Sequence, residues 1–251
     1  MAGSSSSIPR PDRACSSYLV DGGDSSIVFD LGTGALANLR RHVDYDRLGS
    51  VVISHMHADH FLDLIPLRYA VRYGSRRRTN KIRVYLPPGG LAMLRALVST
   101  FAHEGGDFLN DAYDLHEYDP SQPLAVDGAT LRFARTAHYI PAFAARWERD
   151  GASVTYSADT APDQRVVELA RESDVFICEA TLRCGETEHG ERGHCTAAEA
   201  AEMAQAAGVR RLVLTHYGEE STAADLDLSA REIFTGEIVV ADDHHTLTLA
   251  P

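Results

Sequence analysis

The residues best suited to chemistry lie in one short stretch. Ser54 to His60 reads Ser-His-Met-His-Ala-Asp-His, with three histidines and an aspartate within six residues, directly after the apolar run Val51–Ile53. Imidazole nitrogen and carboxylate oxygen are ligands that zinc and similar divalent ions take. Ligands at this spacing cannot all converge on one ion. We therefore expect two neighbouring ions, one bound by His55 and His57 and the other by Asp59 and His60. A histidine-rich surface turn is the alternative, which the preceding buried strand disfavours.

This motif resembles the His-x-His-x-Asp-His signature of the metallo-β-lactamase superfamily. The resemblance implies an α/β (α+β) fold, a four-layer αββα sandwich with two metals at one edge. Three further residues, His138, Asp159 and His216, each end or follow a predicted strand in the family's order, although a strand end often carries an ordinary polar residue. The implied ligand set is His55, His57 and His138 on one ion, Asp59, His60 and His216 on the other, and Asp159 bridging both. Zn²⁺ is the expected metal, with Mn²⁺ or Fe²⁺ as alternatives.

Two further motifs point to a subgroup. Cys178-Glu179-Ala180-Thr181 and Gly193-His194-Cys195-Thr196-Ala197 resemble the Glu-Ala-Thr and His-Ser-Thr motifs of the ribonuclease Z group, although two cysteines replace the usual histidine and serine. The resemblance implies that His194, partnered by Glu179, donates a proton or contacts phosphate. His194 also lies just before a predicted helix, whose N-terminal dipole favours an anion. The alternative is a structural salt bridge.

The expected function is that of a dinuclear metal-dependent hydrolase, a phosphodiesterase acting on small phosphodiesters such as cyclic nucleotides. A hydroxide bridging the two ions would attack phosphorus, and Asp59 would help to orient it. Ribonuclease Z enzymes that mature tRNA carry a protruding arm between the ligands matching His138 and Asp159, where this chain has only twenty residues. A ribonuclease Z-like RNA endonuclease, an acyl, lactone or thioester hydrolase, and a non-catalytic metal-binding module are the alternatives.

Composition limits the partners. A formal net charge of -12 disfavours a polyanion such as tRNA, so the expected partner is a small phosphorylated substrate. No apolar run is long enough to span a membrane, and Met1-Ala2-Gly3 with its serines does not resemble a secretory signal. The four cysteines show no disulfide pattern, which favours free thiols and a cytoplasmic location. A homodimer is the assembly that we consider.

One basic segment interrupts the acidic composition. Arg68 to Arg83 holds seven basic residues and no acidic one. It is either a docking patch for a phosphorylated substrate or a solvated loop.

Strands and helices alternate in two similar halves without a linker, which predicts one domain over residues 1–251, with a first edge strand possible upstream of this start. The predicted strands are Ser17–Val20, Ile27–Phe29, Ser50–Ile53, Ile82–Leu86, Thr130–Thr136, Ala142–Trp147, Ser153–Ser157, Asp174–Cys178, Leu212–Leu214, Ile238–Val240 and Thr246–Leu249. The predicted helices are Ala35–His42, Asp59–Arg72, Leu91–Phe101, Pro162–Glu172, Thr196–Ala207 and Thr222–Phe234. His42, His103 and His116 lie outside any ligand-like context.

Overall fold

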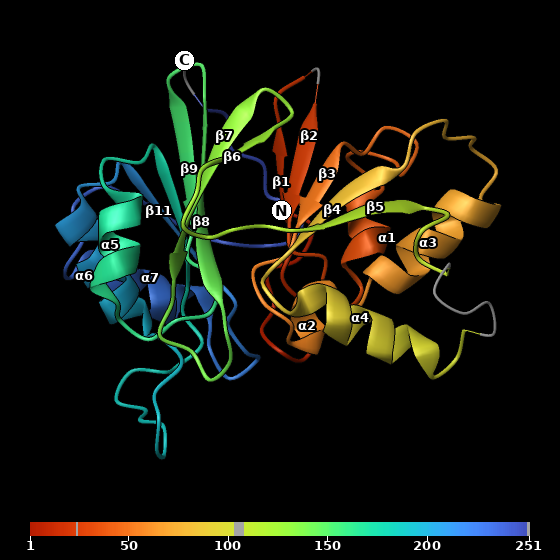
Figure 1. Ribbon diagram of the computed structural model, residues 1–251. Coiled ribbons are helices and arrows are strands. Elements are labelled where there is room, and N and C mark those ends of the chain that lie inside the picture. Colours follow the sequence, from red (N-terminus) through yellow and green to blue (C-terminus); the bar gives the residue numbers. More distant parts are fainter. Residues whose placement is uncertain (24, 103–107, 250–251) are drawn as a thin grey trace.

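Two β-sheets face each other and carry helices on their outer faces (Figure 1). The computed structural model describes residues 1–23, 25–102 and 108–249. The five-stranded sheet has the order β1 (Tyr18–Asp21), β2 (Ser26–Phe29), β3 (Ser50–Val52), β4 (Ile82–Leu86) and β5 (Tyr113–Glu117). The seven-stranded sheet has the order β12 (Glu237–Val240), β11 (Arg211–Thr215), β10 (Val175–Glu179), β9 (Ala152–Tyr156), β8 (Phe143–Arg149), β7 (Ala129–Arg135) and β6 (Leu124–Val126).

Three apolar layers hold the sheets and helices together. The helices α1 (Ala35–Leu39), α3 (Leu64–Tyr73) and α4 (Gly90–Ser99) pack on the five-stranded sheet, and α5 (Gln164–Ala170), α6 (Ala197–Ala207) and α7 (Ala223–Arg231) on the seven-stranded sheet. A third cluster, with Phe29 and Val52 from one sheet and Trp147 and Val213 from the other, fills the space between them. Burying apolar side chains in each layer is the main stabilising term for such a stack. The predicted four-layer αββα fold is confirmed.

Strand direction gathers the chemistry at one edge. Strands β2 to β5 are parallel, as are β9 to β12, and β7 runs in the same direction as β9 because β8 is antiparallel to both. The segments that follow β3, β7, β9, β10 and β11 therefore leave from the same side of their sheets. Helix α2 (Ala58–Phe61) lies at this edge, at the bottom of the sandwich in Figure 1.

Several predicted element boundaries are wrong. The segment Thr246–Leu249 is not a strand, and the predicted helix Asp59–Arg72 is two helices, α2 and α3. Proline at Pro66 is tolerated in the first turn of α3 but not deeper inside a helix, so one continuous helix is excluded. Helix α1 stops at Leu39 rather than at residue 42. Strands β5 and β6 were not predicted.

The basic segment is largely tied down by acidic partners from other elements. Arg68 is buried, and its guanidinium contacts Asp111 at 2.7 Å. Arg76 pairs with Asp44 at 3.0 Å, and Arg83 pairs with Asp127. Arg72 in α3 also pairs with Asp111, at 3.4 Å. Arg77, Arg78 and Lys81 precede the N-terminal end of β4, at the sheet edge opposite the one that carries α2. The stretch between α3 and β4 is a loop, and docking of a phosphorylated substrate on it stays a prediction.

The remaining histidines and the cysteines have simple structural contexts. His42 Nε2 lies 3.1 Å from His244 Nδ1, and His116 lies beside Asp114, both away from the histidine cluster. His103 lies outside the described residues. The four cysteines are free thiols, as predicted; the three that are buried are Cys15, Cys178 and Cys195. None of the helices in the described residues is long and apolar enough to cross a membrane.

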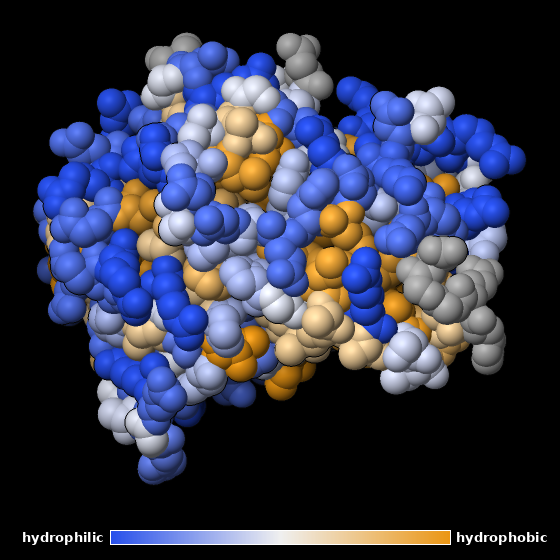
Figure 2. All heavy atoms as spheres, viewed as in Figure 1, coloured by the Kyte–Doolittle hydropathy of each residue, from blue (hydrophilic) through white to orange (hydrophobic). Residues whose placement is uncertain are grey.

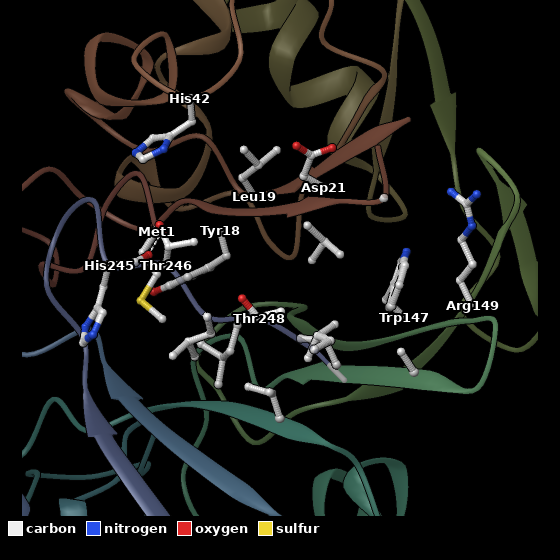
Figure 3. A pocket seen from close by; sticks show the side chains of 18 of the residues that line it. Met1, Tyr18, Leu19, Asp21, His42, Trp147, Arg149, His245, Thr246 and Thr248 are labelled. Atoms are coloured by element: carbon white, nitrogen blue, oxygen red, sulfur yellow. Dashed lines mark hydrogen bonds between the residues drawn. The ribbon is translucent and has the colours of Figure 1, made fainter. Parts of the chain in front are cut away.

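A cavity of about 720 Å³ opens between the sheets (Figure 3). Tyr18, Trp147 and Thr248 line it, together with the residues at the N-terminal ends of β9 and β10. It lies at the edge away from α2, and none of the predicted metal ligands lines it. Figure 2 shows a mostly hydrophilic surface on the viewed face, with hydrophobic side chains gathered over α4, where Met93 is half exposed. The cavity is therefore distinct from the cluster of histidines.

Candidate metal centre

The loop after β3 presents its histidines from two kinds of backbone. His57 has extended backbone angles and immediately precedes α2, whereas Asp59 and His60 lie in the first turn of that helix. The change from extended chain to helix turns these side chains in different directions, which explains how neighbours in sequence can serve two groups. His55, Asp59 and His60 are all buried.

The first group of possible ligands combines the β3 loop with the ends of β7 and β9. Nδ1 of His57 lies 3.1 Å from Nε2 of His55 and 3.0 Å from Nε2 of His138. Asp159 approaches the same histidines from the end of β9. One ligand atom from each of the four residues lies within 4.8 Å of every other, close enough for one metal ion to contact all four.

The second group lies beside the first. Nε2 of His60 and Nε2 of His216 each lie 3.3 Å from Oδ2 of Asp59. Asp159 completes this group as well, again with all ligand atoms within 4.8 Å of one another. His216 adopts a left-handed backbone conformation (φ 56°) directly after β11, which turns its side chain away from the strand direction.

Asp159 faces both groups with different oxygens. Oδ2 lies 3.7 Å from Nε2 of His55 and 3.9 Å from Nε2 of His138. Oδ1 lies 3.4 Å from Nε2 of His60 and 3.6 Å from Nε2 of His216. The structure therefore brings all seven predicted ligands together and divides them into the two sets that the resemblance implies.

Unsatisfied polar atoms show that these residues fit a metal. Among the described residues, Nε2 of His60 and Oδ1 of Asp159 are buried and have no hydrogen-bond partner. Buried polar atoms are rarely left without a partner, because an atom that loses its hydrogen bonds to water and makes none in the protein destabilises the fold. Both atoms point at neighbouring ligand atoms in the second group, so a cation between them would satisfy both.

In the first group, electrostatics favour the protonation states that bind metals. Burial holds the pKa of His55 well below its usual range, and burial also lowers the pKa of His57 and His138. Burial alone would raise the pKa of Asp159, but the nearby His216 and His60 hold it well below its usual range. Neutral imidazoles and an ionised carboxylate are the forms that coordinate divalent ions. In the second group, burial alone would lower the pKa of His60, but Asp159 and Asp30 outweigh burial and hold this pKa well above its usual range, as expected for an imidazole among carboxylates without a cation.

A shell of hydrogen bonds orients the histidines from behind. His60 Nδ1 contacts Asp30 at 2.7 Å, and His138 Nδ1 contacts the carbonyl oxygen of Gly193 at 2.9 Å. His216 Nδ1 lies 2.8 Å from the hydroxyl of Thr181. Such partners fix the ring so that the opposite nitrogen points inward. In each of these histidines Nε2 is the nitrogen that faces the other ligand atoms.

Asp30 braces the whole loop. It follows β2 with a left-handed backbone (φ 57°) and is fully buried. Its carboxylate accepts hydrogen bonds from the amide and the hydroxyl of Ser54 at 2.7 Å each, and from the hydroxyl of Tyr156 at 2.8 Å. Together with the contact to His60, these bonds join both sheets to the loop that carries the histidines.

Glu179 and His194 meet beside the two groups. Glu179 is buried at the end of β10, and its Oε1 lies 2.9 Å from Nδ1 of His194. Burial by itself would lower the pKa of His194, but the Glu179 carboxylate outweighs it, and the pKa rises to about 9. The His194 ring stacks 6.0 Å from the His216 ring. The arrangement therefore holds a protonated imidazole next to the candidate metal centre.

The sequence did not indicate two residues at the mouth of this site. Tyr139 follows His138, and Glu188 lies in the segment between β10 and α6, where no pattern marks it. The Tyr139 hydroxyl donates to Glu188 across 49 residues of sequence. Only the fold places these two side chains together, so no local signal could have found them.

The relatives in sequence are hydrolases where their names state an activity. A family model for the beta-lactamase superfamily domain matches residues 25–217. The chain is 36% identical to the uncharacterized protein Mb1374 of Mycobacterium bovis over 96% of this chain and 89% of that protein. It is 30% identical to the ribonuclease Z of Mycobacterium bovis over 100% of this chain and 98% of that protein.

Solved structures agree with the sequence relatives. The metallo-beta-lactamase fold protein YhfI of Bacillus subtilis superposes with a TM-score of 0.85 at 25% identity, covering 96% of this chain and 95% of that chain. A diphosphatase of the PhnP family superposes with a TM-score of 0.73 at 17% identity, over 99% and 98% of the two chains. The protein is thus a metallo-hydrolase with the metallo-β-lactamase fold. The chain belongs to the beta-lactamase superfamily.

Proposed function

We propose that this protein is a dinuclear metal-dependent phosphodiesterase that acts on small phosphodiesters such as cyclic nucleotides. The observation that carries the proposal is the position of His194, held by Glu179 beside two ligand groups that share Asp159. Phosphodiester cleavage needs two kinds of help: charge neutralisation at phosphorus and a proton for the departing alcohol. The site offers a group for each.

Two divalent ions would be held by the seven His and Asp residues, with Zn²⁺ favoured by the mixed nitrogen and oxygen donors. Bound there, the ions would lower the pKa of coordinated water toward roughly 7 and offset negative charge on the phosphate oxygens. Asp59 lies between His60 and His216, where its carboxylate would also orient the attacking water. Asp59 thus combines a ligand role with the positioning role that the sequence suggested.

His194 supplies the proton. Glu179 occupies Nδ1 of the imidazole, so Nε2 is the nitrogen available to a substrate oxygen. The carboxylate itself is fixed, because Oε1 accepts the amide of Thr160 at 2.7 Å and Oε2 accepts the amide of Thr181 at 3.2 Å. A general acid held this firmly gives a departing alkoxide its proton in the transition state.

Small substrates are favoured because the chain leaves no room for an arm. The residues between His138 and Asp159 form β8 and β9, which Asp150 and Gly151 join in a tight turn with positive φ angles. The alignment with the ribonuclease Z of Mycobacterium bovis spans 279 positions, whereas this chain has 251 residues, so some positions of that relative have no counterpart here. A net charge of -12 also opposes a large polyanion.

The test is to assay the purified protein on four substrate types: a cyclic nucleotide, bis-p-nitrophenyl phosphate, a thioester and a lactone. We expect hydrolysis of the two phosphodiesters. Preferred hydrolysis of the thioester or the lactone would replace this proposal with acyl chemistry on the same site.

Three buried thiols further lead us to propose a reducing compartment, the cytoplasm.

A further inference from the structure

Tyr139 is an exposed aromatic residue at the mouth of the candidate site. Its ring centroid lies 4.8 Å from that of His138 and 5.7 Å from that of His194. The residue is 46% exposed. Among the large exposed hydrophobic or aromatic residues that the structure describes, it is the one whose ring contacts a candidate metal ligand. A substrate held at the metals would therefore meet this ring.

The backbone of Gly193 covers one face of the ring. A Cβ atom at residue 193 would lie 2.5 Å from Cζ of Tyr139 and 2.8 Å from each of its two Cε atoms. A point at similar distances from all three atoms lies over the face of the ring and not at its edge. The close packing requires glycine, and the exposed area of the residue lies away from Gly193.

Glu188 fixes the orientation of the ring. The Tyr139 hydroxyl donates a hydrogen bond to Oε1 of Glu188. Oε2 of Glu188 accepts the amide of Gly193 at 2.8 Å and the amide of His194 at 3.2 Å. One carboxylate therefore ties the hydroxyl end of the ring to the same backbone that covers its face. This carboxylate also anchors the main chain of His194.

We infer that Tyr139 is a specificity-determining residue whose exposed ring stacks on the planar base of a nucleoside phosphodiester, and that Glu188 is its positioning residue. The inference rests on the proposed function and narrows its substrate class to nucleotides. Any nucleotide base can stack on an aromatic side chain, because every base has a π-face. A ring that is already fixed loses little conformational freedom on binding, which strengthens the contact. An alkyl ester would gain little from it.

The first measurement compares two ligands that differ in the base. Calorimetry on the metal-loaded protein gives Kd for adenosine 5′-monophosphate and for ribose 5-phosphate. We expect the nucleotide to bind roughly ten-fold more tightly. Tyr139→Leu should remove this preference by weakening the nucleotide alone. Tyr69→Leu is the matched control, because Tyr69 is 42% exposed on α3, away from the site.

Two further variants separate the ring from its support. Tyr139→Phe keeps the ring and loses the bond to Glu188, so most of the base preference should remain. Glu188→Ala frees both the ring and the His194 backbone, so it should reduce the base preference and also lower kcat. On a cyclic nucleotide, Tyr139→Leu should raise KM roughly ten-fold with little change in kcat.

Equal affinity of the wild type for the two ligands would overturn the inference, as would a base preference that survives Tyr139→Leu. A wild type that prefers the nucleotide but hydrolyses no phosphodiester would instead overturn the proposed function and leave the stacking residue standing. The two failures are therefore distinguishable.

Discussion

At the scale of single residues, the site depends on which atom of each side chain is already occupied. His60, His138 and His216 use Nδ1 for a hydrogen bond to the surrounding protein and turn Nε2 inward. His57 does the reverse and presents Nδ1. Asp159 differs from all of them because its two oxygens face different groups. Loss of this residue should therefore affect both groups at once.

The metal content should separate Asp159 from His138. We expect close to two divalent ions per chain in protein purified without chelator. Asp159→Ala should lose both ions, because each group loses a ligand. His138→Ala should leave about one ion. Elemental analysis of the folded variants measures this, and one ion at full occupancy in the wild type would contradict the dinuclear site.

The role of His194 should depend on the leaving group. An alkoxide leaves poorly without a proton, so His194→Ala should lower kcat/KM on a cyclic nucleotide by roughly 10²–10⁴-fold. A nitrophenolate leaves readily, so the loss on bis-p-nitrophenyl phosphate should be smaller. Both ions should remain, because His194 is not among the seven candidate ligands. Equal losses on the two esters would mean that His194 binds phosphate without donating a proton.

Glu179→Gln should show a weaker version of the same pattern. The glutamine side chain keeps the shape of Glu179 but replaces one carboxylate oxygen with an NH₂ group. At the position of Oε2 this NH₂ group would face the backbone N–H groups of Thr181 and Cys195, and at the position of Oε1 it would face that of Thr160. We therefore expect a lower melting temperature in addition to the change in kcat/KM. Unchanged kinetics on both esters would remove Glu179 from the proton transfer.

At the scale of elements, sequence patterns predict the features that neighbouring residues determine, such as helix caps. The cap of α6 is an example: Thr196 and Glu199 form the predicted capping box. The sequence carries little signal for strand β5, because only Tyr113 and Leu115 of its five residues are apolar and only Tyr113 is buried. The segment Thr246–Leu249 alternates because Leu247 and Leu249 pack against the layer between the sheets, without pairing to a strand. Pairing and packing of this kind depend on the fold and not on the local sequence.

The candidate site divides along the same line. The residues in the short motifs, such as His55, Asp59 and Glu179, could be selected from the sequence because their spacing is itself the signal. Tyr139 and Glu188 could not, since a hydrogen bond between two loops defines their role. Residues that act through such contacts become visible only when the loops are placed.

Two helix caps offer a matched test of how an element positions the site. Thr196 caps α6 two residues after His194, and Thr222 caps α7 without contact to the site. Thr196→Ala and Thr222→Ala should each lower the free energy of unfolding by about 1 kcal/mol. Only Thr196→Ala should also lower kcat/KM on a cyclic nucleotide, because it loosens the chain that carries the proton donor. Denaturant unfolding and kinetics measure the two effects, and equal kinetic losses would show a global cause.

At the scale of the whole molecule, charge and shape act on the substrate together. The chain carries a net charge of -12, and the basic residues Arg68, Arg76 and Arg83 are paired with aspartates. Binding of a long polyanion draws its affinity from many free basic groups. A small diester needs only the few contacts at the candidate metal centre. The molecule as a whole therefore favours the small substrate.

This preference predicts the outcome of a direct comparison with precursor tRNA. At physiological salt we expect hydrolysis of a cyclic nucleotide and no useful cleavage of a tRNA 3′ trailer. The reason is that β8 and β9 fill the stretch between His138 and Asp159, where the resemblance to ribonuclease Z implies an arm in the enzymes that mature tRNA. The ribonuclease Z of Mycobacterium bovis, 30% identical to this chain, is the positive control on the same RNA. Varying the salt concentration separates the effect of the net charge from the effect of the missing arm. If charge alone opposes tRNA, cleavage should stay absent at low salt, where like-charge repulsion is least screened, and appear as salt rises. If the missing arm decides, cleavage should be absent at every salt concentration. Efficient trimming at physiological salt would show that this fold can select tRNA without an arm and without a basic surface.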